Sequence, residues 1–303
     1  MHWTAVIPPV AGLLLAPLLA GVINRTKAGF AGRRGQPLLQ LYFDIFKLLR
    51  KGATYSRTTT WVFRAGPIVG LAAVVAALTL VPMGALPGPL RFRGDLLLFA
   101  YLLCLMRFFT VIAALDTGSS FEGMGASREV LFSALAEPAL LLGLAAVALE
   151  TRQVSLSPML GSVSAGTWLK QGPAFALVAV ALGLVLLAEN SRIPFDDPTT
   201  HLELTMIHEV MVLDHGGPDL AFILYGAALK LWALGVLLVG LAVPLRSGSH
   251  LLDAGAFLGG MVLLGVLIGA VESCMARLRL LRVPKLLVGA TALAMLALVL
   301  ILR

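Results

Sequence analysis

The chain has 303 residues, of which 59% are hydrophobic and only 13% are charged. Soluble proteins carry about 25% charged residues, so this composition excludes an ordinary soluble domain. The two cysteines, Cys104 and Cys274, exclude a disulfide framework. Because no cysteine pair has ligand spacing, we expect no iron–sulfur cluster, cysteine-based metal site or other redox cofactor in this chain.

Eight apolar runs near 20 residues are each long enough to cross a hydrocarbon core of roughly 30 Å as a helix. Alternating strand patterns are absent, so we predict an all-α polytopic membrane protein with a single membrane domain over 1–303. The first run follows Met1-His2-Trp3-Thr4, which holds no Lys or Arg, and this indicates a retained helix rather than a cleaved signal. The predicted spans are 5–23, 62–82, 95–114, 130–149, 171–189, 220–244, 252–271 and 285–302.

Lys and Arg are distributed unevenly between the two sides of these spans. Of the 23, 15 lie after spans 1, 3, 5 and 7 or just inside span 2, while six lie on the opposite side and two, Arg107 and Lys230, lie within spans. This bias predicts that the first group is cytoplasmic and that both termini lie outside the cell inner membrane. The net charge of +7 then reflects topology and attraction to anionic lipid, and requires no nucleic-acid partner.

The dense polar segments all fall on the predicted cytoplasmic side, where we expect them to receive a partner. We predict an interfacial amphipathic helix near 37–50, with leucines and Ile45 opposite Asp44 and Lys47. A second such helix is expected within 190–218, with Asp197 as N-cap and Pro198 at its first position. The predicted docking segments are 24–61, 115–129, 190–219 and 272–284.

Ionisable residues within the spans point to function, because a charge in lipid is expensive. Glu137 lies about two turns into span 4 and is followed by Pro138, while Arg107 and Lys230 lie within spans 3 and 6. One interpretation is a buried proton relay. The other is that these groups pair with one another or with carbonyls and fix helix packing.

Further carboxylates line the cytoplasmic side. Glu189 and Glu272 stand at helix C-termini, where they oppose the macrodipole, and each could pair with the arginine next in sequence, Arg192 or Arg277. Asp116 could equally be a helix cap. Grouped carboxylates repel, so some should titrate near neutral pH, as proton transfer requires. The candidate proton-path residues are Asp116, Glu122, Glu129, Glu137, Glu189, Asp196, Asp197, Glu203, Glu209, His201, His208 and Glu272, and the candidate charge-setting residues are Arg107, Arg128, Arg192, Lys230 and Arg277.

His201, His208 and His215 are spaced by seven residues, which differs from the i, i+4 spacing of helical zinc sites. We expect proton shuttling or hydrogen bonding from them, and no metal. Nucleotide-binding, nucleophile-elbow and zinc-protease motifs are absent from the sequence. Gly255 and Gly259 form a small-xxx-small pattern that indicates close helix packing.

Several motifs occur in an order that suggests a family. They are Arg33-Arg34-Gly35-Gln36-Pro37, Asp116-Thr117-Gly118-Ser119, Gly125-Ala126-Ser127-Arg128-Glu129, Glu137-Pro138, Arg192-Ile193-Pro194-Phe195-Asp196 and Glu272-Ser273-Cys274-Met275-Ala276-Arg277-Leu278-Arg279-Leu280. With them the chain resembles the membrane subunit of group 4 membrane-bound [NiFe] hydrogenases, the type of formate hydrogenlyase and hydrogenase-4. It is more distantly similar to the complex I subunit that seats the quinone tunnel.

The resemblance implies an eight-helix anchor for hydrogenase-like large and small subunits and an iron–sulfur subunit, with [NiFe] and iron–sulfur clusters held by those partners. It also implies a polar axis leading to antiporter-like membrane subunits. Glu129, Glu137, Glu189, Arg192, Asp196 and Glu203 match family positions, and Arg33, Arg34 and Arg279 lie in motifs that imply partner docking. The chain departs from complex I at Thr199 and His201, where carboxylates are expected, although a histidine remains protonatable.

We therefore expect a non-catalytic membrane subunit that anchors a hydrogenase-type electron-transfer module and couples it to ion movement. Three alternatives stay open. A complex I-type quinone subunit would have a cavity that reaches the helix near 37–50. A stand-alone transporter would work without partners, and a passive anchor would tolerate the change Glu137→Gln.

Overall fold

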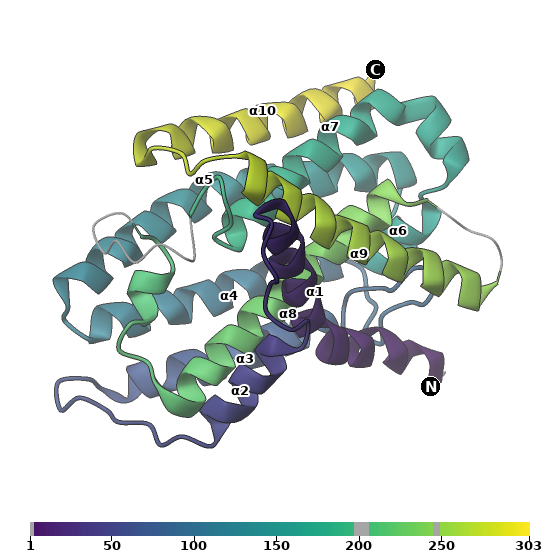
Figure 1. Ribbon diagram of the computed structural model, residues 1–303. Helices are drawn as coiled ribbons and strands as arrows, with labels where there is room; N and C mark the ends of the chain where they lie inside the picture. The colour runs from purple at the N-terminus through teal and green to yellow at the C-terminus, as the bar shows by residue number, and fades with distance from the viewer. Residues whose placement is uncertain (1–2, 197–205, 245–248) are drawn as a thin grey trace.

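The computed structural model describes residues 3–196, 206–244 and 249–303. Within these ranges every regular element is a helix, apart from one isolated bridge between Met83 and Leu86. The elements in chain order are η1 (Trp3–Val6), α1 (Ile7–Phe30), α2 (Gln40–Leu49), α3 (Trp61–Leu78), α4 (Asp95–Asp116), α5 (Ser120–Thr151), α6 (Leu156–Ser162), α7 (Ala165–Glu189), η2 (Glu209–Val212), α8 (Gly217–Ala242), α9 (His250–Cys274), η3 (Leu280–Arg282) and α10 (Val283–Leu302) (Figure 1).

Eight of these helices, α1, α3, α4, α5, α7, α8, α9 and α10, are long and apolar enough to cross a membrane. They confirm the eight predicted spans and the all-α polytopic class. Both chain ends lie on the right-hand side of Figure 1, as an even number of crossings requires. The chain is therefore a multi-pass membrane protein.

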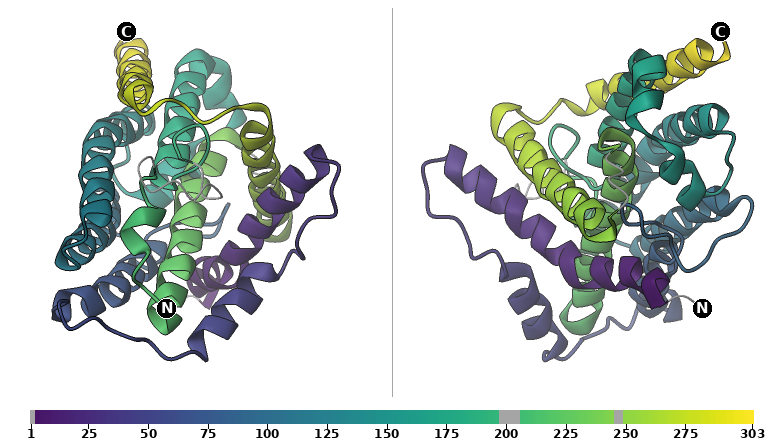
Figure 2. Two further views of the ribbon diagram at one scale, coloured as in Figure 1. Left: turned by 60° about the vertical axis from the view of Figure 1, so that its left-hand side comes forward. Right: turned by 90° about the vertical axis from the view of Figure 1, so that its right-hand side faces the viewer.

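The eight helices differ in how deeply they are buried. α8 packs against α1, α2, α3, α7 and α9, and 67% of its apolar window is buried. α10 packs mainly on α5 and α7, and only 22% of its apolar window is buried. α9 and α10 follow one another in sequence but stand apart in both views of Figure 2. α8 is thus the central helix, and it can bring groups from several other helices together.

The predicted docking segment 115–129 is helical from Ser120 on, because α5 begins there and not near residue 130. The polar start of α5 packs against η2. Gly125 permits this approach, since a Cβ at that position would lie 2.3 Å from Val210 Cγ1 and 2.9 Å from the Ile207 carbonyl oxygen. The first turns of α5 are therefore too polar to belong to the apolar pattern, and they pack against the loop that contains η2.

The predicted interfacial helix is present as α2. Its start is held close to α1, where the Leu38 carbonyl oxygen would lie 2.1 Å from a Cβ at Gly21, so only glycine fits there. Phe43 and Phe46 are exposed while Leu41 packs on the core, as expected for a helix between a bundle and a lipid surface.

α8 also supplies a hydrogen bond that α1 lacks. Pro17 has no N–H group, so the Leu13 carbonyl has no donor within α1. The Tyr225 hydroxyl donates to this carbonyl at 2.8 Å.

The second predicted interfacial helix falls largely on residues that the structure does not describe, among them Asp197 and Pro198. Between residues 206 and 216 the one regular element is the short η2 turn. The packing predicted for Gly255 and Gly259 is wrong, because both face open space. Gly260, Gly265 and Gly269 are the close-packed glycines of α9, with neighbours within 3.0 Å of an added Cβ.

Candidate functional site

Arg107 on α4 is surrounded by three carboxylates from α5 and α7. Its Nη1 donates to Glu137 at 2.6 Å, and its Nη2 donates to both carboxylate oxygens of Glu189 at 2.7 Å. Its Nε lies 3.8 Å from Glu129 Oε1, too far for a hydrogen bond, and has no other partner. Lys230 Nζ on α8 contacts Glu189 Oε2 at 2.8 Å. We call these five residues the Arg107 cluster.

A second ionic group lies on the side of the predicted docking segments. Glu272, at the end of α9, contacts Lys27 at 2.8 Å and Arg192 at 3.3 Å, and its side chain is fully buried. Asp196 contacts Arg277 at 2.8 Å and accepts from the backbone N–H groups of Ile207 and His208 at 2.9 and 3.3 Å. These contacts join α1, α9 and the segments after α7 and α9.

The pairing expected from sequence proximity is wrong at both helix ends. Glu189 pairs with Arg107 and Lys230 rather than Arg192, and Glu272 pairs with Lys27 and Arg192 rather than Arg277. Where a helix ends and the chain turns, side chains that are close in sequence point in different directions and so find different partners. The Glu272 partner Lys27 was missed because nothing in the sequence relates the ends of α1 and α9, which pack together only in the fold.

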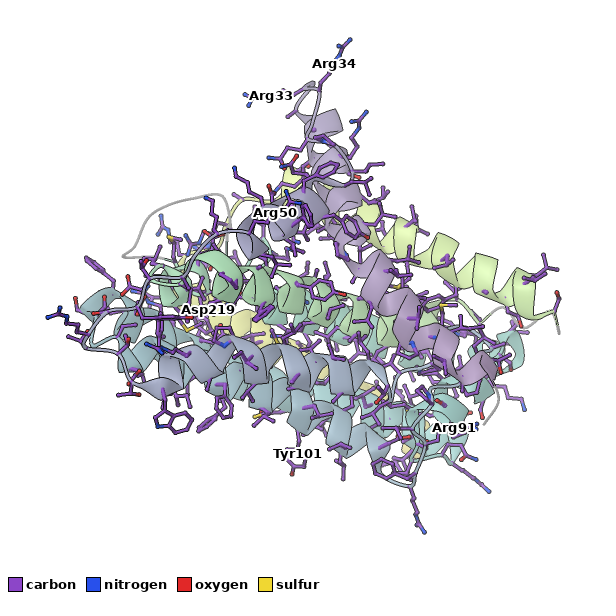
Figure 3. All side chains as sticks on the ribbon, turned by 90° about the horizontal axis from the view of Figure 1, so that it is seen from below. Arg33, Arg34, Arg50, Arg91, Tyr101 and Asp219 are labelled. Carbon is purple, nitrogen blue, oxygen red and sulfur yellow. The ribbon has the colours of Figure 1, made fainter. Side chains whose placement is uncertain are left out.

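Glu137 differs from the rest of the Arg107 cluster in exposure. Its side chain is 40% exposed, whereas the Glu189 side chain is 4% exposed. The surrounding surface of α4 and α5 is apolar and carries Tyr101, Phe108 and Leu141. Figure 3 shows Tyr101 directed away from the bundle on this surface. The cluster therefore reaches from the interior to the lateral face of the helix bundle.

Three cavities are connected in series by shared lining residues, and two of the three are lined by residues of the Arg107 cluster. A cavity of about 40 Å³ is lined by Arg107, Glu129, Glu189, His208 and Lys230 among others. It shares His208 with a cavity of about 490 Å³ on the side of the predicted docking segments. It shares Arg107 and Glu189 with a cavity of about 80 Å³ that is also lined by Glu137. A water molecule needs about 10–15 Å³, so each of these cavities has room for water, and the side chains that line the 40 Å³ cavity are mostly polar.

Two histidines that lie outside the spanning helices, His208 and His215, border the 490 Å³ cavity. Burial lowers the pKa of His208 to about 4, with Lys230 lowering it further and Asp196 opposing the shift. Burial alone lowers the pKa of His215 to about 4. His215 stacks on Phe63 with ring centroids 3.9 Å apart, and its Nδ1 has no hydrogen-bond partner. Both histidines are neutral at pH 7.

Other candidate residues lie apart from the Arg107 cluster. Asp116 accepts from the backbone N–H groups of Thr60 and Phe63, so it caps α3 from the end of α4. Glu122 is buried, with one oxygen bonded to the Asp214 N–H and the other unpartnered. Arg128 donates to the Met206 carbonyl at 2.8 Å and so holds the loop rather than the cluster.

The remaining predicted positions are exposed, line a cavity or lie outside the described residues. Arg33, Arg34 and Arg279 are exposed, and Figure 3 shows the first two at the outer tip of the segment after α1. Glu209 lines the 490 Å³ cavity. Asp197, His201 and Glu203 lie outside the described residues. Among the residues that the structure describes, no three His, Cys, Asp or Glu side chains are grouped to hold a metal ion.

Comparison with known proteins agrees with this architecture. The chain is 33% identical to formate hydrogenlyase subunit 4 of Escherichia coli over 92% of each chain, and 32% identical to hydrogenase-4 component C of the same organism over 79% of this chain and 74% of that one. It shares its fold with a chain of the membrane-bound sulfane sulfur reductase, an archaeal respiratory membrane complex, at a TM-score of 0.81 and 21% identity over 98% of both chains.

These relatives indicate a membrane subunit of a hydrogenase or complex I-like respiratory complex, which confirms the resemblance noted in the sequence. The family model described as NADH dehydrogenase matches residues 4–302, almost the whole chain. The chain therefore belongs to the NADH dehydrogenase family.

Proposed function

We propose that this protein is the membrane anchor and proton path of a hydrogenase-type energy-converting complex in the cell inner membrane, with both termini outside. It docks a cytoplasmic module that carries the [NiFe] and iron–sulfur clusters and couples electron transfer there to ion movement. The observation that carries the proposal is the line of cavities from the docking side through the Arg107 cluster to Glu137.

The route begins at the 490 Å³ cavity and passes His208, which also borders the smaller cavity beside Glu129 and Glu189. A neutral histidine can accept a proton on one nitrogen and release one from the other, so His208 is suited to pass protons inward. From Glu129 and Glu189 the route continues to Glu137 past Arg107, which contacts all three carboxylates.

The exit of the route is the apolar lateral face around Glu137. A carboxylate that is 40% exposed is expensive against hydrocarbon, so another protein covers this face in the membrane. An antiporter-like membrane subunit with a polar or basic group at the depth of Glu137 would complement the charge. The relatives support partner subunits in general, since they belong to multi-subunit hydrogenase and respiratory complexes.

The docking side is preorganised for the electron-transfer module. The pairs Asp196–Arg277 and Glu272–Arg192 hold the segments after α7 and α9 in place, while Arg33, Arg34 and Arg279 remain exposed. Exposed arginines beside fixed backbone suit a partner with surface carboxylates.

Purification of the full chain from its native membranes with a mild detergent tests the proposal. We expect hydrogenase-like large and small subunits, an iron–sulfur subunit and antiporter-like subunits to co-purify. Replacing Arg33 and Arg34 by alanine should release the cytoplasmic subunits and retain the membrane subunits. The matched control replaces Arg91 and Arg93, two exposed arginines between α3 and α4, and should release none. Isolation of the chain without companions, or ion transport by the reconstituted chain alone, would contradict the proposal.

One observation favours a second candidate, a complex I-type quinone site. The 490 Å³ cavity reaches Leu41 of α2 and is largely apolar, with Leu220, Ile223 and Leu224 in its wall. A cavity that meets the interfacial helix is the feature expected for a quinone subunit. Solvent extraction of the purified complex, with and without the change Leu41→Trp, separates the two candidates. Stoichiometric quinone that is lost in the variant would support the quinone site, and an empty extract would exclude it.

A further inference from the structure

The numbers of positive and negative side chains in the Arg107 cluster are unequal. Arg107 and Lys230 supply two positive charges, while Glu129, Glu137 and Glu189 supply three negative charges when all are ionised. His208, which borders the same cavity, is neutral at pH 7. An uncompensated buried charge is far more expensive than protonation of one carboxylate. Charge balance therefore requires one proton in the cluster.

The three carboxylates are not equivalent hosts for that proton. Glu189 receives hydrogen bonds from Arg107 on both oxygens and contacts Lys230, so it is held as the carboxylate. Glu137 has one short contact with Arg107, and Glu129 has none within hydrogen-bond distance. The buried Nε of Arg107, directed at Glu129, is the one nitrogen of this guanidinium that lacks a hydrogen-bond partner.

We propose that Glu129 and Glu137 share a single proton, and that only one of them is ionised at a time while Glu189 is ionised between Arg107 and Lys230. In the arrangement described, Glu129 holds the proton and Glu137 is ionised against Nη1. When the proton moves, the Glu129 O–H bond breaks and an O–H bond forms on Glu137 through water in the adjoining cavities. Arg107 then shifts its contact from Glu137 to Glu129 through Nε. The charge of the cluster is unchanged throughout.

The surroundings of the two carboxylates agree with this exchange. The charged groups near Glu129 are Arg107, Lys230, Glu189 and Asp196. Glu129 and His208 both line the 40 Å³ cavity. Glu137 is faced by Arg107 and by Cys104 on α4. α10 also packs on α5 but carries no charged residue between 286 and 302. Arg107 is thus the charged group that contacts both carboxylates, which lie eight residues apart on one helix.

This inference deepens the proposed proton path and rests on it for the direction of transfer, from the inner cavities to the lateral face. The occupancy by one proton rests on the charges alone. Infrared spectra of the purified full chain at neutral pH, in H₂O and D₂O, test the occupancy because they detect the C=O stretch of a protonated carboxyl group. The result does not depend on whether the assembled complex couples ion movement.

We expect the wild-type band assigned to the cluster to vanish completely in Glu129→Gln and also in Glu137→Gln, since two carboxylates then balance two cations. Glu129→Asp and Glu137→Asp should each shift part of the band, whereas Glu189→Asp should not shift it. Lys230→Met should about double the band, because one cation then balances three carboxylates. If that variant does not fold, Glu189→Gln tests the same balance, with loss of the band expected.

Glu150→Gln is the matched control, since Glu150 is a carboxylate near the other end of α5 outside the cluster, and it should leave the band unchanged. Retention of the band in Glu137→Gln would place the proton on Glu129 alone and overturn the sharing. A wild-type spectrum without a band that responds to Glu129 or Glu137 would show three ionised carboxylates and overturn the charge balance.

Discussion

Arg277 contacts Asp196 at 2.8 Å and thereby joins the segment after α9 to the segment after α7. Asp196 also accepts two backbone N–H groups from residues 207 and 208, so one buried carboxylate fixes three parts of the docking side. The loops of the proposed docking side are therefore held in place by charges within this chain.

The change Arg277→Ala should lower the stability of the solubilised protein by about 3 kcal/mol, because it leaves Asp196 buried and ionised without its guanidinium. Arg279→Ala is the matched control, since Arg279 is exposed and two residues away, and should change stability by less than about 0.5 kcal/mol. Thermal unfolding of both variants in the same detergent checks the difference. Equal melting temperatures would show that the pair does not hold the loop.

Gly125 sets how closely α5 approaches the loop over residues 207–211. Gly125→Ala should destabilise the protein by roughly 1–3 kcal/mol, because the new methyl group would overlap Val210 and the Ile207 carbonyl. Gly123→Ala, two residues earlier on the same helix, meets open space and should be neutral or stabilising by up to about 1 kcal/mol. Limited proteolysis of the loop and thermal unfolding measure both effects. A Gly125→Ala protein as protected as wild type would disprove the close approach.

Stability should fall when the pH drops below the ordinary histidine pKa of about 6.5. The folded protein keeps His208 and His215 neutral down to about pH 4, whereas the unfolded chain protonates them below about pH 6.5, so acid favours unfolding. Each such histidine contributes up to about 1.4 kcal/mol per pH unit in this window. Melting temperatures measured from about pH 7 to about pH 5 should decline less steeply in His208→Gln and in His215→Gln, and an unchanged slope in both would contradict the assignment.

The spans were predictable because an apolar run of about 20 residues matches the thickness of the hydrocarbon core. α2 was predictable because its apolar residues recur with helical periodicity. Residues 120–129 were not, since this polar stretch of α5 lacks the apolar pattern, and its contact with the loop around Val210 is visible only in the fold. The glycines of α9 show the same limit. The spacing of Gly255 and Gly259 suggests packing, but the contacts fall on Gly260, Gly265 and Gly269, and only the neighbouring helices decide which face is used.

The candidate site was predictable in its residues but not in its pairs. Glu137, Glu189, Arg107 and Lys230 are recognisable as charges within or at the ends of apolar spans. Their convergence depends on the packing of α4 and α7 against α5 and of α8 against α7, which the sequence does not report. Asp95 was missed altogether, although it is buried and caps α6 through Ser155 and the Leu156 N–H, because its place at the first turn of a span resembles an ordinary helix start.

The most direct test of the proton path compares Glu137→Gln with Glu150→Gln in the assembled complex, reconstituted in vesicles. The measured quantity is the number of protons moved per electron transferred. Both variants should assemble with their partner subunits. Glu150→Gln should retain the wild-type ratio, whereas Glu137→Gln should slow proton transfer by about 10²-fold or more and abolish coupling. An assembled Glu137→Gln complex with an unchanged ratio would contradict the account and leave the chain as a passive anchor.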